Sequence, residues 1–125
     1  MISDTPTHTT PTSFSELGLI APLLARLAEL EYKQPTPIQA QAIPSVLAGR
    51  DLIAGANTGS GKTATFALPM LQYLAQVKAA EKSVNKNKGK YASKGNYVSG
   101  LILVPTRELA KQVADSIKSY AAHFN

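Results

Sequence analysis

The chain carries the stretch Ala56-Asn57-Thr58-Gly59-Ser60-Gly61-Lys62-Thr63, which matches the pattern of a phosphate-binding loop. Glycine lets a backbone turn sharply and approach a phosphate closely, so Gly59 and Gly61 predict a concave loop lined by N–H groups. A helix beginning directly after the loop would add unpaired N–H donors and the positive end of its dipole. Lys62 would contact the β- and γ-phosphates, and Thr63 would offer its hydroxyl to Mg²⁺. The loop therefore predicts nucleotide binding, and a Gly/Ser/Thr turn without a ligand is the alternative.

The residues on either side supply the context that a phosphate-binding loop requires. Residues 51–54 read as a short buried strand, and a helical pattern follows the loop to about residue 77, with Pro69 expected to kink it. The apolar residues of this helical pattern are Phe66, Met70, Tyr73, Leu74 and Val77. One position departs from the strict pattern, because Ala56 stands where the first glycine is usual. A methyl group fits there if the backbone keeps a negative φ, so the match stands.

Two helices are expected before the loop. The first has an apolar stripe made of Leu23, Leu24, Leu27 and Leu30. The second opens with Thr36 as the capping residue, a proline in the first turn and Gln39 at the third position. We expect it to run to residue 48 and to stop at Gly49, with Pro44 as a bend.

A second strand and a last helix follow. Residues 100–104 are an apolar run without alternation, which predicts a strand buried on both faces. Thr106 is then expected to cap a helix that carries Leu109, Val113 and Ile117 on one side. The order strand–helix–strand–helix predicts a right-handed parallel βαβ unit, the core of a P-loop α/β sheet with flanking helices. Two strands are too few for an independent sheet, so we expect the front part of a larger domain, truncated after the second core strand and its helix.

The charge of the chain is concentrated in one connector. The net charge is +5, and residues 78–94 hold six lysines and a single acid, so the remainder is neutral. These lysines are Lys78, Lys82, Lys86, Lys88, Lys90 and Lys94. A solvated flexible loop is the simpler interpretation. The alternative is an auxiliary electrostatic contact with nucleic-acid phosphates, to which Tyr91 and Tyr97 could add stacking.

Composition argues against several other classes of protein. No apolar run approaches the roughly 20 residues that a membrane span needs, so we expect no membrane contact. Residues 1–12 are rich in threonine and proline, lack the apolar region of a secretory signal, and read as a disordered tail. The chain has no cysteine, which excludes a disulfide-linked partner and thiolate metal sites and is compatible with a cytoplasmic location.

Four elements occur in order along the chain: Phe14, the run Gln34-Pro35-Thr36-Pro37-Ile38-Gln39, the loop at 56–63, and the run Pro105-Thr106-Arg107-Glu108-Leu109-Ala110. Together they resemble the N-terminal part of the first RecA-like domain of a DEAD-box ATP-dependent RNA helicase, most similar to the bacterial members. The resemblance covers residues 13–122. It implies a partial domain over residues 13–125, which divides into an adenine-recognition region at 13–49, a phosphate-loop unit at 50–77, the connector at 78–98 and a strand and helix at 99–125.

The resemblance implies ATP with Mg²⁺ as the ligand. Gln39 would pair its amide with the adenine edge, since an amide offers one donor and one acceptor side by side, and Phe14 would pack against the base. Residues 56–63 would hold the phosphates. Lys62 and Thr63 would be the catalytic residues, and Thr63 would also be the Mg²⁺ ligand. The alternative for Gln39 is a capping box with Thr36 that needs no ligand. One amide cannot fully serve both roles, and we favour the ligand.

The resemblance also implies RNA as a partner. Pro105, Thr106 and Arg107 follow the second strand, at the end of the sheet where α/β proteins bind ligands, and would contact the sugar–phosphate backbone without reading sequence. Thr106 as a plain helix cap, with Arg107 paired to a carboxylate, is the alternative.

The sequence also departs from the family pattern. Glu31 stands before Tyr32 where the family usually has glycine, so the local backbone is expected to differ slightly, and Asn57 stands where glutamine is common. The Asp-Glu-Ala-Asp and Ser-Ala-Thr motifs and a second RecA-like domain are absent from the 125 residues, so we expect this chain alone to be inactive. Two alternatives stay open: a non-catalytic nucleotide- or RNA-binding remnant, and a P-loop NTPase or kinase of another class.

Overall fold

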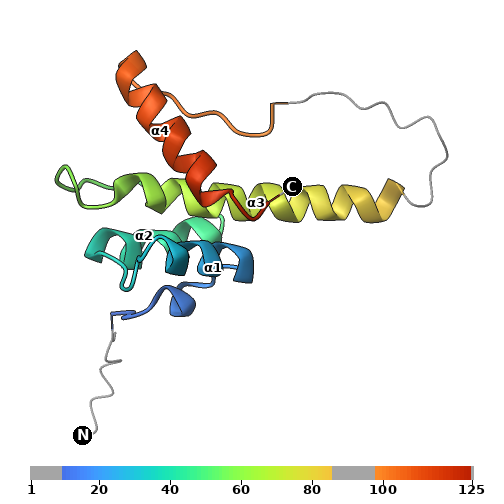
Figure 1. Ribbon diagram of the computed structural model, residues 1–125, viewed down its shortest axis with the longest axis horizontal. Coiled ribbons are helices and arrows are strands. Elements are labelled where there is room, and N and C mark those ends of the chain that lie inside the picture. Colours follow the sequence, from blue (N-terminus) through green and yellow to red (C-terminus); the bar gives the residue numbers. More distant parts are fainter. Residues whose placement is uncertain (1–9, 86–97, 125) are drawn as a thin grey trace, which may run out of the picture.

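The computed structural model describes residues 10–85 and 98–124, and five helical elements make up its regular structure there (Figure 1). A 3₁₀ turn, η1 (Phe14–Leu17), precedes helices α1 (Ala21–Glu29), α2 (Pro37–Leu47), α3 (Lys62–Asn85) and α4 (Arg107–Tyr120). Helix α3 contacts α2 on one side and α4 on the other, while η1 packs on α2 and α1 meets α4. Residues 1–9 of the tail predicted at 1–12 and residues 86–97 of the connector predicted at 78–98 lie outside the described residues.

The helix starts form as their sequences predict. Thr36 caps α2 in a complete capping box: its hydroxyl accepts a hydrogen bond from Gln39 N–H, and its own N–H donates to the Gln39 side chain. Thr106 caps α4, where its hydroxyl accepts from Leu109 N–H at 3.2 Å. Helix α2 ends where the sequence predicts. Ala48 is its C-cap, and Gly49 follows with a φ of 77°.

One hydrophobic core joins the elements before and after the loop. Leu23 and Leu27 of α1, Ile43 of α2 and Leu68 of α3 are its largest fully buried side chains. The other buried residues of this core are Phe14, Leu17, Leu19, Ala64, Ala67 and Tyr120. Because this core includes both the α2 and the α3 side of the loop, it fixes the position of residues 56–61 between the two helices.

Helix α3 is longer than predicted. It continues past Pro69 and past residue 77 to Asn85, so the first part of the predicted lysine-rich connector is helical. The physical reason is composition, since residues 78–82 read Lys-Ala-Ala-Glu-Lys and all of these residue types favour helix. Across the described parts of the chain, no helix is both long and apolar enough to cross a lipid bilayer.

The predicted strands are absent from the described residues. Residues 51–54 and 100–104 form no strand within 10–85 and 98–124, and the expectation that both would be buried is wrong for this chain. Ile53 is fully exposed, and Leu101 and Leu103 are 73% and 84% exposed, while Ile102 and Val104 are half-buried. A strand needs a neighbour for its backbone and a layer over each apolar face, and the described residues provide neither.

Glu31 adopts a backbone conformation that suits glycine. Its φ of 61° lies in the left-handed region, and it is the only non-glycine residue with a positive φ among those described. The DEAD-box family that the sequence resembles usually has glycine at this position. Here the turn before Tyr32 is kept, although Glu31 carries a Cβ that this backbone conformation disfavours. An L-residue in this region costs about 1–2 kcal/mol relative to glycine.

We expect Glu31→Gly to stabilise the protein by about 1 kcal/mol, because glycine adopts this φ without a Cβ clash but loses more conformational freedom on folding. Urea unfolding followed by circular dichroism measures the change. Glu31→Ala is the matched control, since it removes the same exposed carboxylate and keeps the Cβ. Equal stabilisation by both substitutions would assign the effect to charge and contradict the backbone explanation.

Candidate nucleotide-binding site

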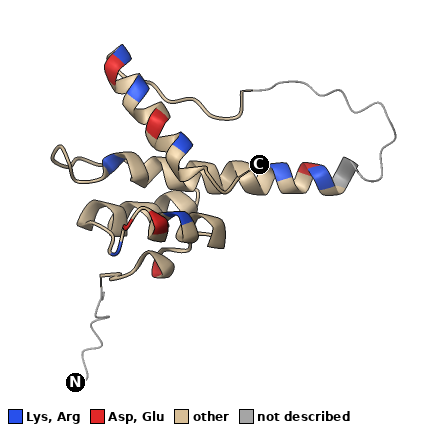
Figure 2. Ribbon diagram, in the orientation of Figure 1, with Lys and Arg blue, Asp and Glu red and all other residues tan. Residues whose placement is uncertain are grey.

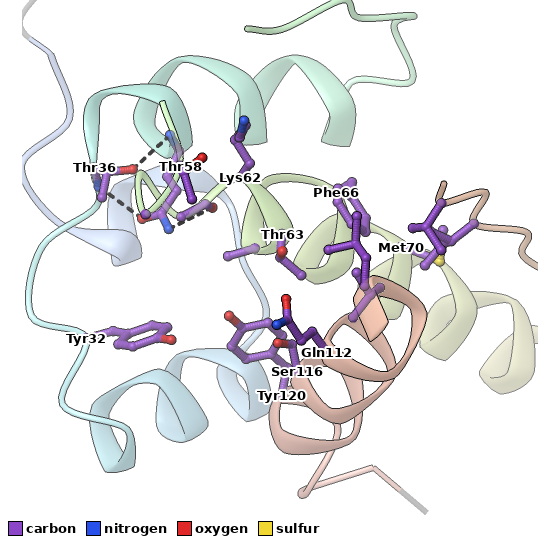
Figure 3. Close-up of a pocket in the computed structure, with 18 of the residues that line it drawn as sticks. Tyr32, Thr36, Thr58, Lys62, Thr63, Phe66, Met70, Gln112, Ser116 and Tyr120 are labelled. Carbon is purple, nitrogen blue, oxygen red and sulfur yellow. Dashed lines mark hydrogen bonds between the residues drawn. The ribbon is translucent and has the colours of Figure 1, made fainter. Parts of the chain in front are cut away.

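A cavity of about 1140 Å³ lies between the loop, α3 and α4 (Figure 3). Seven of the residues predicted to bind nucleotide line it: Phe14, Gln39, Thr58, Gly59, Gly61, Lys62 and Thr63. Ala56, Asn57 and Ser60 belong to the same loop but not to the cavity lining. The opposite wall comes from α4 and from the extended residues 101–104. The structure thus brings the predicted base-side and phosphate-side residues to a single cavity.

The loop has the backbone shape that the glycines predict. Gly59 and Gly61 have φ values of 83° and 82°, whereas Ala56 keeps φ out of the left-handed region, as its methyl group requires. Inside the loop, the only backbone hydrogen bond among the described residues runs from Ser60 N–H to Asn57 O, at 3.2 Å. The N–H groups of Gly59 and Gly61 therefore have no backbone acceptor there, which leaves them available to an anion.

Lys62 reaches back across the loop. Its Nζ donates a hydrogen bond to Ala56 O at 2.6 Å, and the side chain is solvent-exposed. Figure 3 shows that Lys62 and the neighbouring Thr63 leave α3 in different directions, with Thr63 directed toward Gln112 and Ser116 of α4. The Lys62 ammonium group can exchange this carbonyl oxygen for a phosphate oxygen, because a hydrogen bond to an anionic oxygen is stronger than one to a neutral carbonyl.

The loop residues suit a polyphosphate by their chemistry. They combine free N–H donors, one ammonium group and the Thr63 hydroxyl, and the buried Ser60 Oγ has no hydrogen-bond partner among the described residues. Mg²⁺ prefers oxygen ligands and phosphate oxygens, so Thr63 fits as its protein ligand. Glu31, in the turn before α2, is the only carboxylate among the described residues that line the cavity.

Side chains of α2 hold the loop in place. Thr36 Oγ1 donates to Ser60 O at 2.7 Å, and Gln39 Nε2 donates to Gly61 O at 3.2 Å. The other end of the same amide, Gln39 Oε1, accepts from Thr36 N–H at 2.9 Å. Gln39 is 5% exposed, and each end of its buried amide makes one hydrogen bond to the protein itself. The capping box considered from sequence is thus present, and its link to the loop is an addition that the sequence did not indicate.

The aromatic residues that line the cavity are Phe14 of η1, Tyr32 of the turn before α2, Phe66 of α3 and Tyr120 of α4. Phe14 of η1 is buried and lines the cavity. Tyr32 and Tyr120 meet edge to face with ring centroids 6.3 Å apart (Figure 3). Burial, together with the neighbouring Tyr32, raises the pKa of Tyr120. Sequence reasoning did not select Tyr120, because nothing local shows that α4 returns to the turn before α2.

The residues predicted to contact RNA lie apart from this cavity. Pro105, Thr106 and Arg107 are exposed at the start of α4, and none of them lines the cavity. Thr106 caps the helix as described, and Arg107 forms no ion pair with any residue in 10–85 or 98–124. Figure 2 shows basic and acidic residues interspersed along α4 and the end of α3.

Comparisons with known proteins agree on one family. A family model described as DEAD/DEAH box helicase matches residues 36–125. The ATP-dependent rRNA helicase rrp3 of Neosartorya fischeri is 46% identical over 121 residues, which is 97% of this chain and 22% of that protein. The ATP-dependent RNA helicase DeaD of Escherichia coli is 44% identical over 113 residues, 90% of this chain and 15% of that protein.

Solved structures give the same result. The RNA helicase Prp28 from Chaetomium thermophilum bound to ADP superposes with a TM-score of 0.73 at 39% identity, covering 90% of this chain and 24% of that one. Dbp5 of S. cerevisiae bound to RNA and ADP BeF3 superposes with a TM-score of 0.70 at 30% identity, covering 90% and 25%. The chain therefore spans about a quarter or less of these relatives. Fungal and bacterial proteins match it about equally, so the comparisons do not favour the bacterial members.

Proposed function

Because the chain belongs to the DEAD/DEAH box helicase family, we propose that it supplies the ATP-binding loop and part of the RNA-contacting surface of an ATP-dependent RNA helicase. The observation that carries the proposal is the loop itself. Two glycines in the left-handed region, Gly59 and Gly61, leave N–H groups free beside Lys62, while Thr36 and Gln39 hold the loop's carbonyls from behind. Such an arrangement exposes donors and hides acceptors, as an anion site requires.

At the phosphate end, residues 56–63 would bind ATP and Lys62 would exchange Ala56 O for the β- and γ-phosphates. Thr63 would hold Mg²⁺, which supplies charge neutralisation of the phosphates when bound. At the base end, Phe14 would pack against adenine and Gln39 would pair with its edge. Gln39 would share its amide, because single bonds to Thr36 N–H and Gly61 O leave one lone pair and one N–H for the adenine edge. ADP in the related Prp28 structure supports an adenine nucleotide as the ligand.

RNA is the proposed partner of the α4 start. Exposed hydroxyl, guanidinium and helix N-terminal groups at Pro105, Thr106 and Arg107 suit phosphate oxygens, and the related Dbp5 structure contains RNA. The contact would be independent of sequence and weakened by salt. A cytoplasmic location belongs to the same proposal and is supported only by the cysteine-free sequence.

We also propose that residues 51–54 and 100–104 become strands of a parallel sheet in a complete helicase domain. Their support is the fit to solved helicases over 90% of the chain, together with apolar side chains that stay exposed here. Hydrolysis needs a carboxylate at the end of a strand, and the acids after the loop within the described residues, Glu81, Glu108 and Asp115, all lie in helices. The chain by itself is therefore not expected to hydrolyse ATP.

The adenine role is tested with Gln39→Ala in the full-length protein, measured by calorimetric binding of ATP and of inorganic triphosphate. We expect about tenfold weaker ATP binding and unchanged triphosphate binding, because only ATP carries the edge that an amide recognises. Equal losses for both ligands would show that Gln39 acts only through the loop. GTP competing as well as ATP would contradict the proposal that adenine is read.

A further inference from the structure

Gln72 is a buried amide that none of the predicted motifs includes. It lies on α3, on the same helix as Lys62, and is 6% exposed. Its Oε1 accepts from Ile20 N–H at 2.9 Å, and its Nε2 donates to Gly18 O at 3.0 Å. Both ends of the amide therefore bind one short backbone segment that lies more than 50 residues earlier in the sequence.

The segment that Gln72 holds determines where Phe14 lies. Gly18 caps η1 with a φ of 89°, and residues 18–20 connect η1 to α1. Phe14 begins η1, which spans four residues, so a shift of the turn at residues 18–20 moves the ring. Phe14 is 5% exposed and lines the cavity that also contains Gly61 and Lys62. Gln72 thus connects the helix that follows the phosphate loop to the element that carries the base-side aromatic residue.

We propose that Gln72 is a positioning residue that fixes Phe14 relative to the phosphate loop, and so sets the affinity of the site for the base of a nucleotide. The inference rests on the proposed function. An apolar side chain at position 72 would remove the partners of Ile20 N–H and Gly18 O, whose bonds to Gln72 are part-buried, so we expect the turn to shift toward other partners. The ring on η1 would move with it, while the loop, held separately by Thr36 and Gln39, would stay.

The test uses Gln72→Leu in the full-length protein, with ATP and inorganic triphosphate as the two ligands. We expect about tenfold weaker ATP binding and unchanged triphosphate binding, since a misplaced aromatic ring loses its packing with the base. In the same assay Phe14→Ala should give a similar loss, and the double substitution should bind ATP about as well as Phe14→Ala alone. This non-additivity separates positioning from a general loss of stability.

Arg26→Met is the matched stability control. Arg26 donates to Ser119 O at 2.6 Å and to Ser119 Oγ at 3.2 Å, so its loss weakens the α1–α4 contact without touching the turn at residues 18–20. It should lower the unfolding midpoint and keep the ratio of ATP to triphosphate affinity. If Gln72→Leu folds poorly, Gln72→Glu replaces it, because the carboxylate keeps the acceptor for Ile20 N–H and loses only the donor.

The outcomes separate the two proposals. Equal loss of both ligands, no loss, or additive effects with Phe14→Ala would overturn the role of Gln72 while leaving nucleotide binding intact. A wild-type protein that binds triphosphate as tightly as ATP, with no effect of Phe14→Ala, would overturn both the adenine site and the role of Gln72.

Discussion

Lys62→Ala should weaken ATP binding by about 100-fold in the full-length protein, because a charge-assisted contact to the β- and γ-phosphates is lost. The ammonium group lies at the end of an exposed side chain, and among the described residues its hydrogen-bond partner is Ala56 O. Its removal therefore leaves the core intact, and the unfolding midpoint should hardly change. Calorimetric titration with ATP, accompanied by a thermal melt of each variant, measures the two effects separately.

Lys82→Ala is the matched control for this substitution. Lys82 lies in the last turn of the same helix, is exposed and does not line the cavity, so its loss makes the same change in net charge at a distance from the loop. ATP affinity should stay within about twofold of the wild type, given the screening of exposed charges. Comparable losses in Lys62→Ala and Lys82→Ala would mean that ATP responds to overall charge, and the loop would lose its assigned role.

Gly61→Ala is the second substitution with a large expected effect. A Cβ at this position would lie 2.2 Å from Gln39 Nε2 and 3.1 Å from Gln39 Cδ, and the backbone φ is 82°. Gln39 cannot move aside freely, since it is buried and bonded to Thr36. Adding the left-handed cost to that of overpacking gives a destabilisation of about 2–5 kcal/mol, accompanied by loss of ATP binding.

Gly59→Ala separates the two causes. Gly59 has nearly the same φ, 83°, and a Cβ there meets nothing within 4 Å. We expect Gly59→Ala to cost only the left-handed backbone conformation, about 1–2 kcal/mol. Urea unfolding of both glycine variants and the wild type measures the two free-energy changes. If both alanine substitutions destabilise equally, then the contact between Gly61 and Gln39 contributes nothing, and the coupling of α2 to the loop is wrong.

Local chemistry made part of the fold predictable from the sequence. The caps at Thr36 and Thr106 depend on residues three positions apart, and the turn at Gly59 and Gly61 depends on the conformational freedom of those residues themselves. The family was also predictable from the sequence, because its motifs are short and occur in order along the chain. These features form in the structure where the sequence places them.

Long-range contacts explain what the sequence did not predict. Gln39 meets Gly61 across 22 residues, and Gln72 meets Gly18 across 54, so no local pattern reveals either contact. The two predicted strands do not form among the described residues for the same reason. An apolar run such as residues 100–104 has the right composition for a strand, but it becomes one only where another strand is available to pair with it. The roles of Pro105, Thr106 and Arg107 stay predictions.

The hydrogen bonds from Thr36 and Gln39 to the loop make its two ends unequally prepared for a ligand. The phosphate end is preorganised, since the carbonyls of Ser60 and Gly61 are already turned away and a phosphate finds its donors in place. At the base end, adenine would have to share the Gln39 amide with Thr36 N–H and Gly61 O. In the proposed site, Lys62 would also give up Ala56 O for a phosphate oxygen, so the free energy of ATP binding would be a net exchange, smaller than the sum of the contacts in a bound complex.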